Sequence, residues 1–187
     1  MMHRGMTVPV RTLRDVKDDP VELGSGDRWT LLSFLRYASC PSCLLHVREL
    51  VVKHEQLAAA GIDVAVVFHS PVERIRHHTK RLGVCFRMVA DPERLLYREF
   101  RVAASWPKLL GSFLRPSFVP AYAKSLLYGF WGGGVDGEFA RMPADFVIDN
   151  HGGIVLVRYG SHIGDHVRVA DVIALRERRQ LAAGGVA

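Results

Sequence analysis

The sequence predicts an α/β fold with a central mixed β-sheet flanked by helices. Short apolar runs that are typical of buried strands alternate along the chain with amphipathic segments of helical length. Near the C-terminal end, a tight turn separates two apolar runs, which indicates an antiparallel hairpin and makes the sheet mixed. A chain of 187 residues with 49% hydrophobic and 24% charged residues fits one globular domain over residues 1–187.

The first half of the chain provides three strand-and-helix steps. Short alternating pieces in the polar segment 1–28 predict a small strand or hairpin, and the run WTLLSFLR at 29–36 predicts a buried strand. Residues 44–60 have helical spacing that ends at Gly61. Beyond it we expect a strand at 62–68, a helix at 71–82, a strand at 84–90 and a helix from 91 to about 100.

Residues 104–137 interrupt this alternation. Three prolines and a run of three glycines break the segment, so we expect short helices near 109–114 and 121–128 and interpret it as a helical insert. Regular alternation then resumes, with a strand at 144–149, a turn at 150–153, a strand at 154–159 and a terminal helix at 166–181.

Composition limits the classes of partner and compartment. The net charge of +6 allows weak attraction to anions, but no nucleic-acid motif accompanies it, and the apolar runs are too short to span a bilayer. The first ten residues lack the apolar core of a signal peptide. Three cysteines are too few for a secreted disulfide scaffold. We therefore expect a cytoplasmic protein with neither nucleic-acid nor membrane partners.

The sequence Cys40-Pro41-Ser42-Cys43 stands where a buried strand passes into an amphipathic helix, as in thioredoxin-like redox motifs. With Cys40 as the N-cap, Pro41 is the first helical residue, where its missing N–H costs little. The free N–H groups of the first turn and the helix dipole then stabilise a Cys40 thiolate. We predict that Cys40 is the attacking thiol and that Cys43, one turn further and more buried, resolves the adduct.

Two other interpretations of the cysteine pair remain open, a structural pair and a zinc site. Zinc needs four ligands, and the sequence has no second C-x-x-C; His162 and His166 have suitable spacing but lie more than a hundred residues away. We expect no metal and no cofactor, because no glycine-rich phosphate loop follows a strand. We interpret Cys85 as a buried inert thiol and His46 as a solvated helix residue.

Three segments resemble the peroxiredoxin-like branch of the thioredoxin superfamily, often called alkyl hydroperoxide reductase/thiol-specific antioxidant. They are FLRYASCPSCLLHVREL, DPERLLYREF and MPADFVIDNHGGIVLVRYG, and the resemblance covers about residues 7–180 apart from details of the insert. It implies a thioredoxin-like fold with a cis-proline at Pro143, facing the helix of the cysteine pair. We therefore expect Pro41, Met142 and Pro143 to position substrate, with the Met142 backbone N–H and C=O open to an extended segment.

The chain departs from true peroxiredoxins at the activating residues. Counted back from Cys40, the positions of the P-x-x-x-[T/S]-x-x-C motif hold Tyr37 and Ser33, and the place of the activating arginine holds Pro143, with Arg141 nearby. We therefore expect no peroxide-activating hydroxyl or guanidinium at the thiol.

This departure favours thiol–disulfide oxidoreductase activity on a disulfide or peroxide substrate, with the protein recycled by a reducing dithiol partner, either a thioredoxin-like protein or a low-molecular-weight thiol. Two alternatives stay open: a peroxiredoxin-like thiol peroxidase that reduces hydroperoxides, and a non-catalytic binding module in which the insert grips a ligand. The aromatic residues of the insert would suit a lid over Cys40; they are Trp106, Phe113, Phe118, Tyr122 and Phe130.

Overall fold

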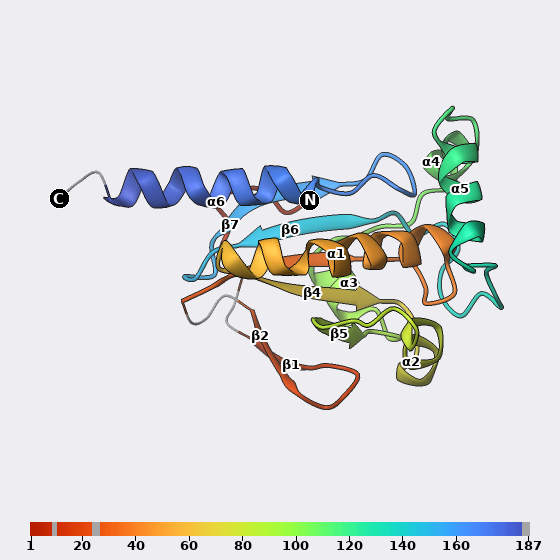
Figure 1. The fold of residues 1–187 in the computed structure, drawn as a ribbon, viewed down its shortest axis with the longest axis horizontal. Coiled ribbons are helices and arrows are strands. Elements are labelled where there is room, and N and C mark those ends of the chain that lie inside the picture. Colours follow the sequence, from red (N-terminus) through yellow and green to blue (C-terminus); the bar gives the residue numbers. More distant parts are fainter. Residues whose placement is uncertain (9–10, 24–26, 185–187) are drawn as a thin grey trace.

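The computed structural model describes residues 1–8, 11–23 and 27–184 and shows a five-stranded mixed sheet (Figure 1). Across the sheet the strands are β5 (Arg87–Ala90), β4 (Ile62–Phe68), β3 (Trp29–Phe34), β6 (Ala144–Ile148) and β7 (Ile154–Tyr159). The strands β3, β4 and β5 are parallel, and β6 and β7 run antiparallel to their neighbours. A separate hairpin pairs β1 (Arg11–Arg14) with β2 (Pro20–Leu23).

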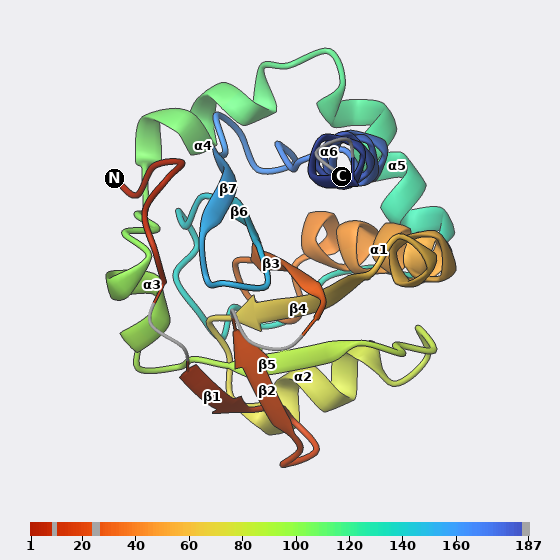
Figure 2. The same ribbon diagram turned by 90° about the vertical axis from the view of Figure 1, so that its left-hand side faces the viewer.

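Helices cover both faces of the sheet (Figure 2). One face packs against α1 (Pro41–Ala59), α2 (Val72–Thr79) and α6 (Val169–Gly184), and the other against α3 (Leu95–Glu99). Side chains alternate along a strand, so Leu31 contributes to the first core and its neighbour Leu32 to the second. This two-sided burial explains why β3, with the sequence WTLLSF, has apolar residues on both faces instead of on one.

The insert forms α4 (Trp106–Phe113) and α5 (Phe118–Leu127). Figures 1 and 2 place α5 beside the N-terminal half of α1, at the end of the sheet where β3 passes into that helix. The helical insert predicted from the sequence therefore lies over the start of α1. No helix in the described ranges is both long and apolar enough to cross a membrane.

The structure corrects the prediction for Cys85. Strand β5 begins at Arg87, so Cys85 precedes it, just after Gly83, whose φ of +62° turns the chain. The thiol of Cys85 is exposed instead of buried. The alternation of Val84, Cys85 and Phe86 resembled a strand, but these residues have no ladder partner among the described strands.

Candidate thiol active site

Cys40 is the N-cap of α1, as the sequence predicts. Pro41 occupies the first turn, and the backbone N–H of Cys43 donates a hydrogen bond to Cys40 Sγ, 3.4 Å away. The structure corrects one detail: Cys40 is as deeply buried as Cys43, with 0% and 2% of their surfaces exposed. Neither cysteine takes part in a disulfide.

The side chain of Arg36, two residues beyond the end of β3, contacts Cys40 directly. Its Nη2 donates to Cys40 Sγ at 3.0 Å, and its Nη1 donates to the carbonyl of Phe139 at 2.9 Å. The Arg36 backbone N–H also donates to Cys43 Sγ at 3.4 Å. The expectation that no guanidinium reaches the thiol is therefore wrong. The signal in the sequence was an arginine that ends a predicted buried strand four residues before a helix N-cap cysteine.

The geometry separates the acidities of the two thiols. Burial opposes ionisation of Cys40, but hydrogen bonds from the Cys43 thiol and backbone, together with the Arg36 charge, lower its pKa to about 6. Burial raises the pKa of Cys43 well above its ordinary value, and the neighbouring Cys40 sulfur raises it further. At neutral pH Cys40 is a thiolate and Cys43 is a thiol, which is the division of roles expected of an attacking and a resolving cysteine.

Two aromatic rings hold the Arg36 guanidinium in place. It lies 5.3 Å from the centre of the Tyr37 ring and 5.6 Å from that of Phe139, and these rings stack with their centres 6.3 Å apart. Burial and the Cys40 charge raise the pKa of Tyr37 to about 12, so this hydroxyl keeps its proton at neutral pH. The Arg36 charge is thus fixed beside the sulfur by its neighbour Tyr37 and by Phe139, which follows the insert.

The structure contradicts the prediction of a cis-proline. None of the described peptide bonds is cis, the Met142–Pro143 bond included. The Met142 N–H donates to the carbonyl of Ala103 at 3.2 Å, and its side chain is buried against Ile163. The segment that leads into the insert occupies this edge, because Ala104 pairs with Arg141. The Met142 N–H is therefore not free to receive a substrate strand.

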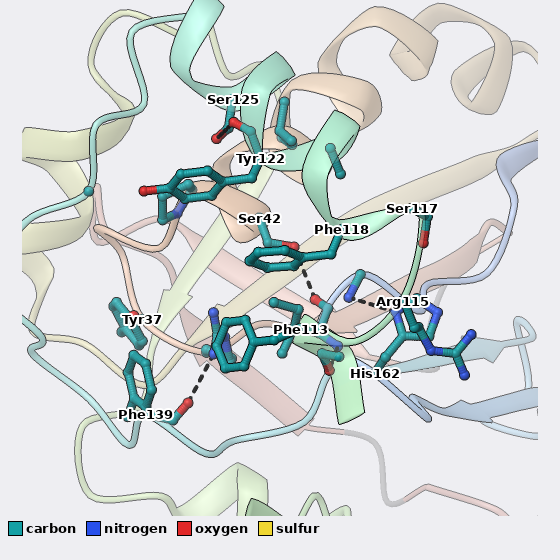
Figure 3. Close-up of a pocket in the computed structure, with 18 of the residues that line it drawn as sticks. Tyr37, Ser42, Phe113, Arg115, Ser117, Phe118, Tyr122, Ser125, Phe139 and His162 are labelled. Atoms are coloured by element: carbon teal, nitrogen blue, oxygen red, sulfur yellow. Dashed lines mark hydrogen bonds between the residues drawn. The ribbon is translucent and has the colours of Figure 1, made fainter. Parts of the chain in front are cut away.

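A cavity of about 510 Å³ opens beside the cysteine pair (Figure 3). Arg36, Tyr37 and Pro41, which surround Cys40, form one part of its wall. The insert supplies the aromatic part, as the lid interpretation expects for three of its five residues, Phe113, Phe118 and Tyr122. Trp131 and Phe139 also line it, whereas Trp106 and Phe130 do not. The cavity is therefore a mainly apolar chamber next to the reactive sulfur.

A buried polar cluster lies beneath α1, and it corrects the interpretation of His46. His46 is only 5% exposed and lies 3.4 Å from the Ser33 hydroxyl, which donates to Asp145 at 2.7 Å. The Nδ1 of His166 lies 3.1 Å from Asp145, and its ring stacks on His46 with centres 3.6 Å apart and planes 6° from parallel. Burial lowers the pKa of His46 to about 3, so His46 is neutral.

Three side chains of this cluster, those of His46, Asp145 and His166, are close enough together to raise the question of a metal site. One potential ligand atom of each lies within 4.8 Å of the others. Imidazole lone pairs lie in the plane of the ring. Two parallel rings stacked 3.6 Å apart therefore do not converge on one ion. The arrangement fits a hydrogen-bonded cluster and does not fit a metal centre.

Comparison with known proteins identifies the family. The sequence pattern of the AhpC/TSA family matches residues 5–157, which is most of the chain. The chain belongs to the AhpC/TSA family. No curated protein matches it significantly in sequence.

Solved structures of AhpC/TSA and related proteins share the fold. The peroxidoxin BcpB of Mycobacterium tuberculosis aligns with a TM-score of 0.69 at 15% identity, covering 95% of this chain and 98% of that one. The AhpC of Enterococcus faecalis aligns with a TM-score of 0.67 at 15% identity, covering 100% and 98%. A putative thiol:disulfide interchange protein DsbE of Chlorobium tepidum aligns with a TM-score of 0.58 at 20% identity, covering 98% and 99%.

These likenesses confirm the predicted peroxiredoxin-like, thioredoxin-superfamily fold. The chain belongs to the AhpC/TSA family and has a buried cysteine whose pKa is lowered. These are features of a thiol-dependent oxidoreductase or peroxidase of the thioredoxin superfamily. The roles of Cys40, Cys43 and Pro41 in a particular reaction, and of Met142 and Pro143 beside substrate, stay predictions.

Proposed function

We propose that this chain is a thiol peroxidase in which Cys40 reduces an organic hydroperoxide and Cys43 resolves the product. The observation that carries the proposal is the hydrogen bond from the buried Arg36 guanidinium to Cys40 Sγ. A fixed cation in a site removed from water stabilises both the attacking thiolate and the negative charge that develops on the departing oxygen. The sequence alone favoured disulfide exchange because this guanidinium was missed.

The proposed reaction proceeds in two steps. The Cys40 thiolate attacks the terminal oxygen of R–O–OH; an S–O bond forms, the O–O bond breaks, and RO⁻ leaves and takes a proton from water. The thiol of Cys43 then attacks the sulfenic acid at Cys40, forming the Cys40–Cys43 disulfide and releasing water. An external dithiol returns two electrons and two protons to the pair.

The burial of Cys40 supports a small or slender substrate. With none of its surface exposed, the Cys40 sulfur does not meet a folded protein disulfide without movement of its surroundings. The apolar cavity beside Arg36 provides room for the organic part of a hydroperoxide. The Met142 N–H, which a docked peptide would use, already donates to Ala103.

Thiol–disulfide exchange is the second candidate function. It is supported by the C-P-S-C spacing and by the opposite directions of the two thiol pKa shifts, which suit an exchangeable disulfide. Its substrate would be a low-molecular-weight disulfide able to enter the cavity.

Turnover assays on a Cys85→Ser background separate the candidates. We expect cumene hydroperoxide to be consumed with dithiothreitol, Cys40→Ser to abolish turnover, and Cys43→Ser, oxidised without added thiol, to hold Cys40 as a sulfenic acid in place of the Cys40–Cys43 disulfide. Peptide mapping after oxidation should find a Cys40–Cys43 bridge. Reduction of hydroxyethyl disulfide without peroxide consumption would favour exchange instead, and inactivity towards both would favour a binding module.

A further inference from the structure

A second cavity of about 560 Å³ adjoins the apolar chamber. It lies between α1, α5 and the segment before α6, and it shares wall residues with the first cavity, namely Ser42, Leu45, Ala121 and Gly164. Ser42 and Leu45 follow Cys40 on one face of α1, and Arg48 and Val52 continue that face into the second cavity. The two cavities are therefore neighbours along the same helix.

The second cavity has more charged side chains in its wall than the first, whose wall holds two cations, Arg36 and Arg115. Its wall carries three cations, Arg48, Lys124 and Arg168, and one carboxylate, Glu49. Arg168 is neutralised by two hydrogen bonds to Asp171, at 2.8 and 2.9 Å. Within the described ranges neither Arg48 nor Lys124 forms an ion pair with a carboxylate. Two cations thus remain available to a ligand.

An aromatic ring helps to fix the position of Arg48. The Arg48 guanidinium lies 3.9 Å from the centre of the Tyr128 ring, which also lines the cavity. The Glu49 carboxylate in the same wall lies 4.0 Å from the Nδ1 of His46, and its side chain is 57% exposed to water. His46 is kept neutral by burial and adds no charge. The balance of the wall therefore favours an anion.

We propose that the second cavity binds the carboxylate of the substrate, so that the substrate class is an apolar hydroperoxide with an anionic end, such as a fatty-acid hydroperoxide. This inference rests on the proposed peroxidase function and adds the substrate class to it. Arg48 follows Cys40 by eight residues, or roughly 12 Å along the helix, a distance within the span of a fatty acyl chain. The aromatic chamber holds the chain, and Arg48 and Lys124 hold the carboxylate.

Direct binding tests the carboxylate subsite without turnover. We expect calorimetry to show that decanoate binds more tightly than decan-1-ol, and that added salt reduces the difference. Arg48→Gln and Lys124→Gln should each weaken decanoate binding by about threefold, and the double variant by about tenfold, with decan-1-ol unchanged. Lys53→Gln is the matched control, because it removes one positive charge from α1 outside both cavities.

Kinetics completes the test. With linoleic acid hydroperoxide, the double variant should raise KM and leave kcat unchanged, whereas with the methyl ester neither constant should change. Equal binding of decanoate and decan-1-ol by the wild type, or an equal loss in Lys53→Gln, would overturn the subsite even if both hydroperoxides are reduced. Selective decanoate binding without reduction of either hydroperoxide would keep the anion site and overturn the peroxidase.

Discussion

Among single residues, Cys43 and Arg36 together offset the effect of burial on Cys40: Cys43 through hydrogen bonds from its thiol and backbone, and Arg36 through its charge. Cys40 is buried, and burial alone would raise its pKa and leave a neutral thiol. The helix N-terminus supplies part of the opposing effect through the Cys43 N–H, and the Arg36 charge at 3.0 Å supplies another part. The thiolate therefore depends on a contact between the segment that follows β3 and the start of α1.

The first prediction concerns the pH dependence of Cys40. A thiol whose pKa is lowered to about 6 is deprotonated above that pH, so its reactivity rises as pH increases through 6 and is nearly constant at pH 7 to 8. The rate of iodoacetamide labelling at Cys40, measured by mass spectrometry in Cys85→Ser protein, should follow this curve. A midpoint near the ordinary thiol value would contradict it.

The second prediction removes the guanidinium. Arg36→Met keeps much of the side-chain volume but loses the charge, so the Cys40 midpoint should move upward by about one to two pH units. Arg36→Lys should restore part of the shift, because a charge without the guanidinium fork reaches fewer partners. The same labelling curve measures both variants. If Met and Lys behave alike, the charge is not the cause.

Local and distant residues of the site differ in how well the sequence predicts them. The placement of Cys40, Pro41 and Cys43 was predictable, because N-cap geometry depends on neighbours along the chain. The contact between Arg36 and the carbonyl of Phe139 joins residues 103 positions apart, and no local pattern encodes it. The cis-proline prediction came from family resemblance and failed where this chain's insert occupies the neighbouring edge.

Between elements, a buried polar cluster ties α1 to β3, β6 and the segment before α6. Asp145 accepts hydrogen bonds from the Ser33 hydroxyl and the Val167 N–H, both at 2.7 Å, and His46 packs on this group from α1. Burial opposes the Asp145 charge, but the His166 ring lowers its pKa. The cluster fixes the helix that carries both cysteines.

The third prediction follows from the acidity of His46. Its pKa is about 3 in the folded protein against about 6.5 when unfolded, so its contribution to stability is complete above pH 6.5 and is lost as pH falls towards 3. The wild type should lose about 1.4 kcal/mol of unfolding free energy per pH unit from this group between pH 6 and 4. Urea unfolding of His46→Gln should show a slope smaller by that amount; an equal slope would contradict the assignment.

The fourth prediction compares two glycines of the insert region. A Cβ on Gly137 would lie 2.2 Å from the carbonyl oxygen of His69, so Gly137→Ala must displace the segment that offers the Phe139 carbonyl to Arg36. We expect a loss of about 2 kcal/mol or more in urea unfolding and slower labelling of Cys40. A Cβ on Gly111 in α4 meets nothing within 4 Å, so Gly111→Ala should instead stabilise by up to about 1 kcal/mol.

The elements themselves were largely predictable because their patterns are local. β4 has the predicted bounds, and α4 and α5 each begin three residues before the predicted start, with Pro107 and Pro120 in their first turns. The strand predicted at 84–90 was too long, because β5 begins only at Arg87. Its start is determined by pairing with β4 and not by the alternation of its own residues. The exposure of Cys85 was missed for the same reason. The burial of His46 was missed because His166 and Asp145, which surround it, lie far from it along the chain.

For the whole molecule, the insert supplies most of the aromatic wall of the cavity beside the cysteine pair. Phe113, Phe118 and Tyr122 come from α4 and α5, and Figure 3 shows them lining the cavity together with Tyr37 and Phe139. Removal of these rings enlarges the chamber and removes apolar contact with an organic substrate, but it leaves Arg36 and both cysteines in place. Substrate size therefore separates the contribution of the insert from that of the thiol.

The fifth prediction uses this separation. Phe118→Ala and Tyr122→Ala should each lower kcat/KM for cumene hydroperoxide by about tenfold, since a lost aromatic contact is worth about 1 to 1.5 kcal/mol. Hydrogen peroxide makes no apolar contact with these rings, so its kcat/KM should change by less than about twofold. Stopped-flow traces with both peroxides give the two ratios. Equal losses would mean that the rings support the position of α1 and its cysteines, and that the chamber does not select substrates by their organic part.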